Sequence, residues 1–222
     1  GRPIKAGEAT LAHLGILFLD ELPEFHRETL EVLRQPLENG SMQIHRGGYT
    51  YDFPAQFMLV GAMNPCPCGF YPDLSRCHCS YTAVRRYQEK ISMPLLDRMD
   101  MMIEVSALSY PQWNQKTQEM SSTQMKKKVE RVREIQKERR KGQSFLFNSR
   151  MGNQELEEYC ALGTQEKKLM KKAFDELKIS ARGYTKILKV ARTIADLEEK
   201  EQIQTEHLQE ALCYRIGNGI YR

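Results

Sequence analysis

The hydrophobic pattern of the chain changes near residue 110, and this change limits the folds that the sequence allows. Before it, short apolar runs end in polar residues, as in GILFLDE (15–21) and QFMLVGAMN (56–64). After it, apolar residues recur at helical spacing between many charged ones. Short runs are typical of strands, and the longer repeat is typical of amphipathic helices. We therefore expect a mixed α/β part over residues 1–110 and an all-helical part over 111–222.

Within the first part, the apolar runs predict buried strands because a strand covered on both faces reads as a continuous hydrophobic run. Three such strands are expected, at 16–19, 57–62 and 101–105. A helix is expected over 25–37, interrupted at Pro36, because proline clashes with the preceding turn.

In the second part, a long and strongly charged helix is expected over 115–141. Nine lysines or arginines lie between 126 and 141 against three glutamates, which fits either a solvated face or a nucleic-acid contact. Ser180 and Thr205 are expected to cap two later helices. Cys160 and Cys213 stand alone in helical contexts, where a cysteine is usually part of the core.

An acidic pair, Asp20-Glu21, directly follows the first predicted strand. In nucleotide hydrolysis, one such carboxylate holds Mg²⁺ and a second polarises the attacking water. The other interpretation is a strand end that carries surface acids. Asn64 ends the second predicted strand and could orient a water or touch a terminal phosphate.

Two arginines extend this pattern. Arg98 follows an apolar pair in MPLLDRMD and could reach a phosphate on a neighbouring subunit, since its guanidinium is planar and permanently charged. Arg182 lies at the start of the amphipathic helix SARGYTKILKVARTIADL. Each residue alone says little, but the ordered set of Asp20-Glu21, Asn64, Arg98 and Arg182 is specific.

Four of the six cysteines, Cys66, Cys68, Cys77 and Cys79, form the pattern C-x-C, eight residues, C-x-C. Four thiolates this close suit a tetrahedral zinc ion, and a site filled by four protein ligands is structural rather than catalytic. The alternatives are four thiols in an exposed loop, or His78 in place of one cysteine ligand.

These motifs together resemble an AAA+ ATPase of the magnesium-chelatase-like ComM/YifB type. GILFLDELPEF is similar to its Walker B segment, GAMNPCPCGF to its sensor 1 segment with a cysteine insertion, LLDRMD to its arginine-finger segment and SARGYTKILKVARTIADL to its sensor 2 helix. The resemblance covers nearly the whole chain. It implies a partial AAA+ core of the P-loop type, followed by a helical lid domain.

The resemblance also implies a role for each residue of the set. Asp20 would hold Mg²⁺, Glu21 would activate water, Asn64 would be the sensor 1 residue, Arg98 would act in trans and Arg182 in cis. ATP would therefore bind between subunits of a ring, with a hexamer as the family's assembly, although the present chain alone could be monomeric.

A hairpin is predicted over residues 41–53, because alternating residues flank Gly47-Gly48. In related ring ATPases a hairpin at this place projects into the central pore. His45 and Arg46 would suit phosphate contact, and Tyr49 could stack on a base. The alternative is an ordinary hairpin packed on its own subunit.

The function that the resemblance implies is an ATP-driven motor on DNA, of the helicase or branch-migration type used in recombination or transformation. One alternative is a chelatase-like ATPase that remodels a protein or cofactor-loading partner. Another is a zinc-stabilised binding module without catalysis. No apolar run is long enough to span a bilayer and no secretory pattern opens the chain, so we expect a cytoplasmic protein without membrane contact.

We predict that the 222-residue chain alone binds ATP poorly and hydrolyses it negligibly. The phosphate loop G-x-x-x-x-G-K-[ST] is absent, and no Gly-Lys pair occurs in the sequence. The family carries this loop upstream of the Walker B strand, so we expect it before Gly1. Phosphate release by the purified chain measures this, and turnover above that of Glu21→Gln would contradict the prediction.

Overall fold

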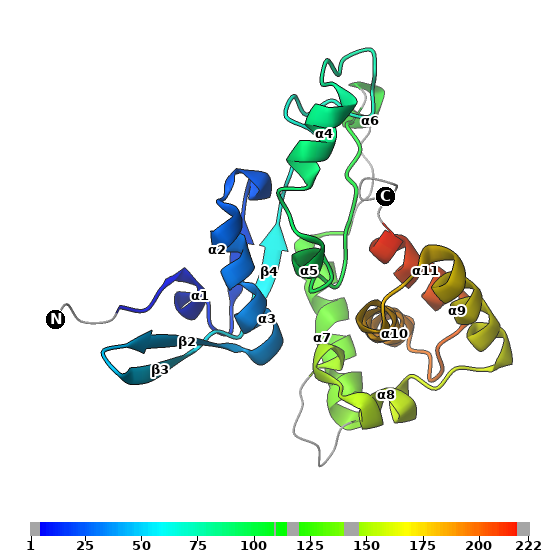
Figure 1. Ribbon diagram of the computed structural model, residues 1–222. Coiled ribbons are helices and arrows are strands. Elements are labelled where there is room, and N and C mark those ends of the chain that lie inside the picture. Colours follow the sequence, from blue (N-terminus) through cyan, green and yellow to red (C-terminus); the bar gives the residue numbers. More distant parts are fainter. Residues whose placement is uncertain (1–4, 109, 115–119, 140–146, 217–222) are drawn as a thin grey trace. The chain divides into compact units, whose positions relative to one another are not determined.

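The computed structural model describes residues 5–108, 110–114, 120–139 and 147–216. The chain forms two compact units that divide between Met99 and Asp100. The first unit contains strands and helices, whereas the described residues of the second contain helices (Figure 1). Mixed α/β content followed by helical content therefore agrees with the expectation from the sequence.

Both sheets of the first unit have two strands. Strand β1 pairs with β4 in parallel, and β2 pairs with β3 in antiparallel orientation. The elements of this unit are, in order, α1 (Glu8–Leu11), β1 (Ile16–Leu19), the 3-10 helix η1 (Leu22–Glu24), α2 (Arg27–Val32), α3 (Arg34–Asn39), β2 (Ser41–Arg46), β3 (Tyr49–Pro54), β4 (Met58–Gly61), α4 (Tyr81–Gln88) and α5 (Met93–Leu96).

The strands β1 and β4 form where the apolar runs predict them, but the expectation that they are buried is wrong. Ile16 and Phe18 are 60% and 58% exposed, and their partners Met58 and Val60 are also exposed. Parallel strands are buried when helices cover both faces of their sheet. Among the described residues nothing covers this face, so its apolar side chains meet solvent.

The helix expected over 25–37 is divided into α2 and α3, and the break lies at Leu33 rather than at Pro36. Pro36 is buried in the first turn of α3, where a backbone N–H has no helical partner to lose. The proline therefore starts a new helix instead of ending the previous one.

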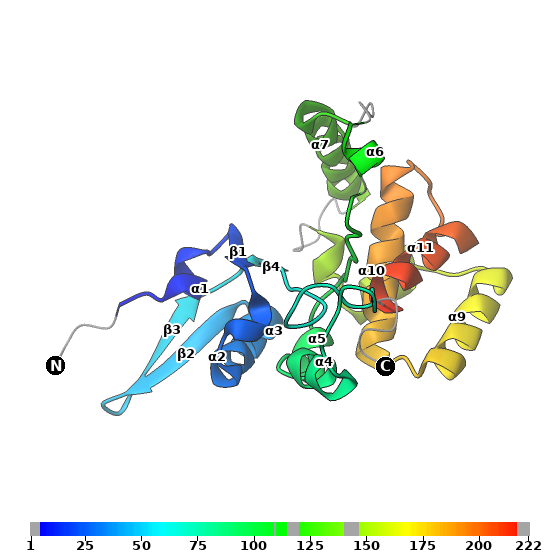
Figure 2. The same cartoon turned by 90° about the horizontal axis from the view of Figure 1, so that it is seen from above.

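The β2–β3 hairpin confirms the prediction for residues 41–53. Its strands are joined by Gly47 and Gly48, which have φ angles of 60° and 79°. Two adjacent positive φ angles match the right-handed strand twist, and glycine adopts them at little cost. Figures 1 and 2 show the hairpin extending from the rest of its unit.

The second unit packs around α10, which contacts α7, η2, α8 and α11 (Figures 1 and 2). Every helix in the described part of the chain is too short or too polar to cross a bilayer. The elements of this unit are α6 (Tyr110–Asn114), α7 (Ser122–Arg139), η2 (Asn148–Arg150), α8 (Asn153–Tyr159), α9 (Thr164–Leu177), α10 (Ala181–Leu197) and α11 (Thr205–Ile216).

Two boundaries in this unit differ from the prediction. Residues 101–105 form no strand, since no described strand lies beside them and Met102 N donates instead to Tyr214 O of α11. Helix α7 begins at Ser122 because Ser121 and Gln124 form a reciprocal cap, with N–O distances of 2.8 and 3.3 Å. Residues 115–119, 140 and 141 of the helix expected over 115–141 lie outside the described residues.

The two predicted caps have different outcomes. Ser180 caps α10 as expected, since its hydroxyl accepts from Gly183 N at 3.0 Å. Thr205 is the first residue of α11 rather than the residue before it, and its hydroxyl donates to Glu166 Oε1 at 2.9 Å. The ring of His207 accepts from Gln204 N instead and serves the start of that helix.

The two isolated cysteines also differ. Cys160 is 3% exposed and belongs to the core of the second unit, as predicted. Cys213 is exposed, which corrects the expectation that it is buried. It directly follows Leu212, which faces the core, and adjacent helical residues point about 100° apart.

A buried charge network joins three elements of the second unit. Asp196 of α10 is fully buried and accepts from Arg139 of α7, Asn148 of η2 and Arg192 of its own helix. The Arg192 guanidinium also donates to Glu201 O at 2.7 Å. Burial opposes ionisation of Asp196, but the hydrogen bonds from Arg139 and Asn148 outweigh it and lower the pKa of this carboxyl.

We expect Asp196→Asn to destabilise the chain by about 3–5 kcal/mol at pH 7, because it leaves buried Arg192 without its carboxylate. Folding lowers the pKa of Asp196 below its unfolded-state value of about 3.9. The stability that the Asp196 carboxylate contributes is therefore complete above about pH 3.9, and it is lost as the pH falls through the pKa of the folded state. Thermal unfolding between pH 7 and pH 3 measures both effects.

Asp175→Asn, which changes an exposed carboxylate of α9, is the control and should leave stability nearly unchanged. If Asp196→Asn melted with the wild type at pH 7, the network would contribute no stability.

Candidate functional site

The parallel pairing of β1 and β4 brings two predicted site segments to one edge of the sheet. Leu19 lies opposite Gly61, and the ladder continues through Ala62 N to Leu19 O at 2.9 Å. Asp20 follows β1 directly, and Asn64 lies three residues after β4. Parallel strands end at the same edge, so the acidic pair and Asn64 leave the sheet on the same side.

The backbone of the acidic pair has an unusual conformation that the sequence did not indicate. Glu21 has φ 49° and ψ 47°, in the left-handed region, and its N–H donates to Asp20 Oδ1 at 2.9 Å. A left-handed non-glycine residue costs on the order of 1 kcal/mol and occurs often at functional sites. This turn presents both carboxylates to solvent.

Leu22 and Gly61 explain how this turn is held. Leu22 is 3% exposed, and its N–H donates to Ala62 O at 2.9 Å beyond β4. A Cβ at Gly61 would lie 3.2 Å from Leu22 Cδ2, so a larger residue at position 61 would push against this side chain. The end of β4 therefore helps to fix the residues that follow β1.

Asn64 is exposed and lies at the start of the cysteine loop. A Cβ at Gly69 would be 3.9 Å from the Asn64 amide, which places these residues side by side. Gln88 of α4 donates to Pro65 O at 3.0 Å and so ties the next residue to a helix. Gln88 is not predictable from the sequence, because a polar residue in a helix is usually solvated.

The two arginines occupy different surroundings. In the first unit, Arg98 follows α5, its side chain is 8% exposed and its Nη2 lies 2.6 Å from Glu38 Oε1. In the second unit, exposed Arg182 lies in the first turn of α10, where its carbonyl accepts from Thr185 Oγ1 at 2.9 Å. The first unit thus brings Asp20, Glu21 and Asn64 to one edge and pairs Arg98 within the chain.

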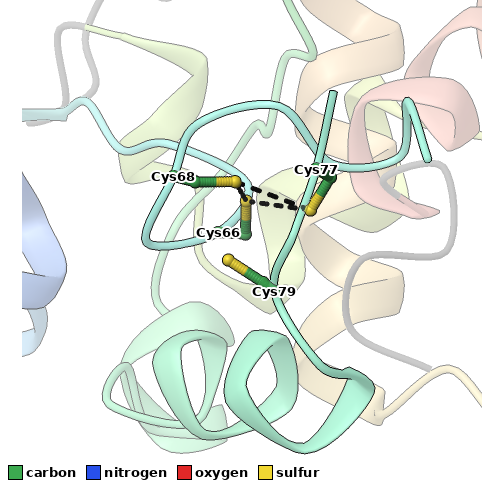
Figure 3. Close-up of side chains that lie close together, drawn as sticks. All are labelled: Cys66, Cys68, Cys77 and Cys79. Atoms are coloured by element: carbon green, nitrogen blue, oxygen red, sulfur yellow. Dashed lines mark hydrogen bonds between the residues drawn. The ribbon is translucent and has the colours of Figure 1, made fainter. Parts of the chain in front are cut away.

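The four clustered cysteines meet as the sequence predicts, with all four sulfurs within 4.8 Å of one another (Figure 3). Cys66 Sγ lies 3.3 Å from Cys68 Sγ and 3.8 Å from Cys77 Sγ. Zinc–sulfur bonds of about 2.3 Å in a tetrahedron place sulfurs about 3.8 Å apart. The donor type, number and spacing therefore fit a zinc ion, whereas exposed His78 lies outside the cluster.

The surroundings of the cysteines favour a bound metal. Cys66 and Cys77 pack with Val84 of α4 in a small core. Tyr71 N donates to Cys66 Sγ at 3.4 Å, and the Phe70 backbone lowers the pKa of Cys68 to about 6. Against the hydrogen bond from the Cys79 backbone, burial and the neighbouring thiols raise the pKa of Cys77 to about 12, and the Cys68 thiol raises the pKa of Cys79. Backbone N–H groups directed at sulfur stabilise the thiolate form, which is the form that binds a metal.

The hairpin places its predicted contact residues on two faces. Arg46 lies opposite Tyr49 in the register, with Ile44 opposite Tyr51 on the same face. Tyr49 is 70% exposed, and its ring centroid lies 6.5 Å from that of Tyr51. His45 lies on the other face, where its Nδ1 is 2.9 Å from the Thr50 hydroxyl. One face is therefore aromatic and basic, and the other is polar.

The charged helix α7 is only partly solvated. Val132 and Gln136 are buried, whereas Met125 and Val129 are about half exposed. Lys126 lies 3.9 Å from Glu130 across one turn. The apolar side chains of α7 thus pack only over the second half of the helix.

Family models match both parts of the chain. Residues 1–113 match the model for magnesium chelatase, subunit ChlI, and residues 119–215 match that for magnesium chelatase, subunit ChlI C-terminal.

Several curated relatives match nearly the whole chain. It is 45% identical over 214 residues to Competence protein ComM of Haemophilus influenzae, a match that covers 95% of this chain and 41% of that protein. Proteins called YifB from Salmonella typhimurium and Escherichia coli are 40% and 39% identical; each match covers 94% of this chain and 40% of the relative. The chain thus spans about two fifths of the length of these relatives.

We expect the purified protein to carry about one zinc ion per chain, because four thiolates complete a structural site. Cys68→Ser should lose most of this zinc, since a hydroxyl is a poor zinc ligand. Elemental analysis after gel filtration measures the ratio.

Cys213→Ser is the matched control, because Cys213 is exposed and outside the cluster, and it should retain the metal. Iron in place of zinc, or equal zinc in both variants, would contradict the assignment.

Proposed function

Because the chain belongs to the magnesium chelatase subunit ChlI family, we propose that it is part of an ATP-driven AAA+ ring motor that acts on DNA. The observation that carries this proposal is the shared edge of β1 and β4, where Asp20, Glu21 and Asn64 leave one sheet. Carboxylates and an amide at the carboxyl ends of parallel strands suit Mg²⁺ and a terminal phosphate.

The residues take separate parts in this proposal. Asp20 holds Mg²⁺, which neutralises phosphate charge when bound, and Glu21 orients and activates the attacking water. Asn64 contacts the terminal phosphate from the neighbouring strand end.

The two arginines complete the proposed site. Arg98 reaches the nucleotide of the next subunit, and Arg182 contacts the nucleotide of its own subunit. ATP then binds at a subunit boundary, together with a phosphate loop that the 222 residues do not contain. This arrangement implies a ring, with a hexamer as the proposed assembly.

Two observations favour DNA as the substrate. The hairpin has an aromatic and basic face, with exposed Tyr49 beside Arg46, and nucleic acids are bound through base stacking and phosphate contact. His45 adds a polar contact on the other face. One relative is named a competence protein. We extend the proposal to work on incoming DNA, of the helicase or branch-migration type.

The second candidate keeps the ATPase and changes the client. The matching family is named for magnesium chelatase, which favours a protein or cofactor-loading partner over DNA. A third candidate is a zinc-stabilised binding module, which the separate cysteine core favours. In every case we assign the cysteine cluster a structural role and place the protein in the cytoplasm.

The deciding experiment measures ATP hydrolysis by the full-length protein, including the residues upstream of Gly1. We expect single-stranded or forked DNA to stimulate turnover. Glu21→Gln should lower turnover by about 10²-fold or more, because the amide cannot act as the base.

Glu28→Gln, which changes an exposed acid of α2, is the control and should behave as the wild type. Turnover that ignores DNA would favour the protein client. Equal turnover in Glu21→Gln would remove the catalytic assignment.

A further inference from the structure

Arg98 is held tightly within its own unit. Its Nη2 lies 2.6 Å from Glu38 Oε1, and its Nη1 donates to Pro94 O at 2.7 Å. The Arg98 side chain is 8% exposed, whereas that of Glu38 is 37% exposed. An arginine in this position can contact a phosphate outside its own chain only after it leaves the Glu38 carboxylate.

Glu38 is closely connected to the base of the hairpin. It lies one residue before the end of α3, and Gly40 then leads directly into β2. Gly40 has φ 72°, its N–H donates to Pro36 O, and its carbonyl accepts from Ala55 N, both at 2.8 Å. These bonds join the end of α3 to both strands of the hairpin.

The joint at Gly40 is also sterically tight. A Cβ at this position would lie 2.8 Å from the Gln56 side chain, closer than ordinary contact allows. Gln56 therefore packs directly against Gly40, so the end of α3, the start of β2 and the residues after β3 meet at one point.

The start of the segment that carries Arg98 also lies near this pair of helices. Ser92, which caps α5, lowers the pKa of the Glu31 carboxyl on α2, as does Arg34. Only the ion pair of Glu38 with Arg98 involves a residue of the proposed nucleotide site.

We propose that Glu38 is a positioning residue that competes with the neighbouring subunit's nucleotide for Arg98 and so couples that nucleotide to the base of the β2–β3 hairpin. This inference rests on the proposed function of Arg98. With Arg98 on the phosphate, Glu38 and the end of α3 are released. With no phosphate in reach, the ion pair holds both Arg98 and the hairpin base.

The competition has a direct consequence for activity. Arg98 can bind the neighbouring nucleotide only during the fraction of time in which it is not paired with Glu38. Its apparent affinity for that nucleotide is reduced by this fraction. Glutamine keeps the size of Glu38 and removes its charge, so Arg98 is available more often. ATP turnover without DNA then rises, and the further rise caused by DNA becomes smaller.

The test uses full-length Glu38→Gln, assayed for ATP hydrolysis with and without a single-stranded oligonucleotide. We expect DNA-free turnover to rise about twofold to fivefold, the range expected for a partly exposed ion pair of ordinary strength. The stimulation by DNA should fall by a similar factor. Glu38→Asp, which keeps the charge on a shorter side chain, should lie between Glu38→Gln and the wild type.

Glu89→Gln is the matched control, because it removes an ion pair of 2.8 Å with Arg85 on α4, away from the hairpin base. It should change neither turnover nor DNA stimulation. Lower turnover and a lower melting temperature in Glu38→Gln, with the DNA stimulation ratio unchanged, would show a purely structural pair and overturn the proposal.

Arg98→Ala separates this inference from the proposed function. If Arg98→Ala hydrolyses ATP as the wild type does, the assigned role of Arg98 fails, and the inference fails with it. If Arg98→Ala is inactive while Glu38→Gln matches the wild type in both rates, only the positioning role of Glu38 is wrong.

Discussion

The parallel pairing of β1 with β4 is the constraint on which the candidate site depends. Its register places Leu19 opposite Gly61, so the residues that follow each strand leave the sheet together. Leu22 then packs over Gly61, which holds Glu21 in its left-handed conformation. Two segments about forty residues apart in sequence thereby present polar side chains at one edge, as ligand sites of parallel sheets require.

The sequence predicted several features whose cause is local, although the Thr205 cap and the break at Pro36 were wrong. Strand ends, the Gly47-Gly48 turn and the Ser180 cap each depend on a few neighbouring residues, and the structure confirms all three. The cysteine cluster was also predictable, because thiols at this spacing have few other uses. Features that depend on residues far away in the sequence were not predictable. Residues 101–105 have the apolar run of a buried strand, but a strand forms only beside another one.

The same limit explains why the charged residues were harder to interpret. Arg192 and Asp196 look like an ordinary surface pair on a helix, but both are buried, because α7 and η2 supply further partners. Arg98 was read as a residue that reaches outward, and the structure pairs it with Glu38, sixty residues earlier in the chain. A charged side chain is buried only when its partners are present, and periodicity does not reveal those partners.

The cysteine loop follows Asn64 directly, and its cysteine cluster restricts the backbone next to this residue. Residues 63–80 contain no helix or strand, so the backbone ladder of a sheet or helix does not hold them. The loop instead has the cysteine cluster, a contact between Pro65 and Gln88, and the Ser80 cap of α4. A metal bound by residues at both ends of a loop lowers the entropy of its open states. Asn64 lies two residues from Cys66, and only Pro65 separates them. The Pro65 carbonyl accepts from Gln88, so a cluster that fixes Cys66 also restricts the backbone of Asn64.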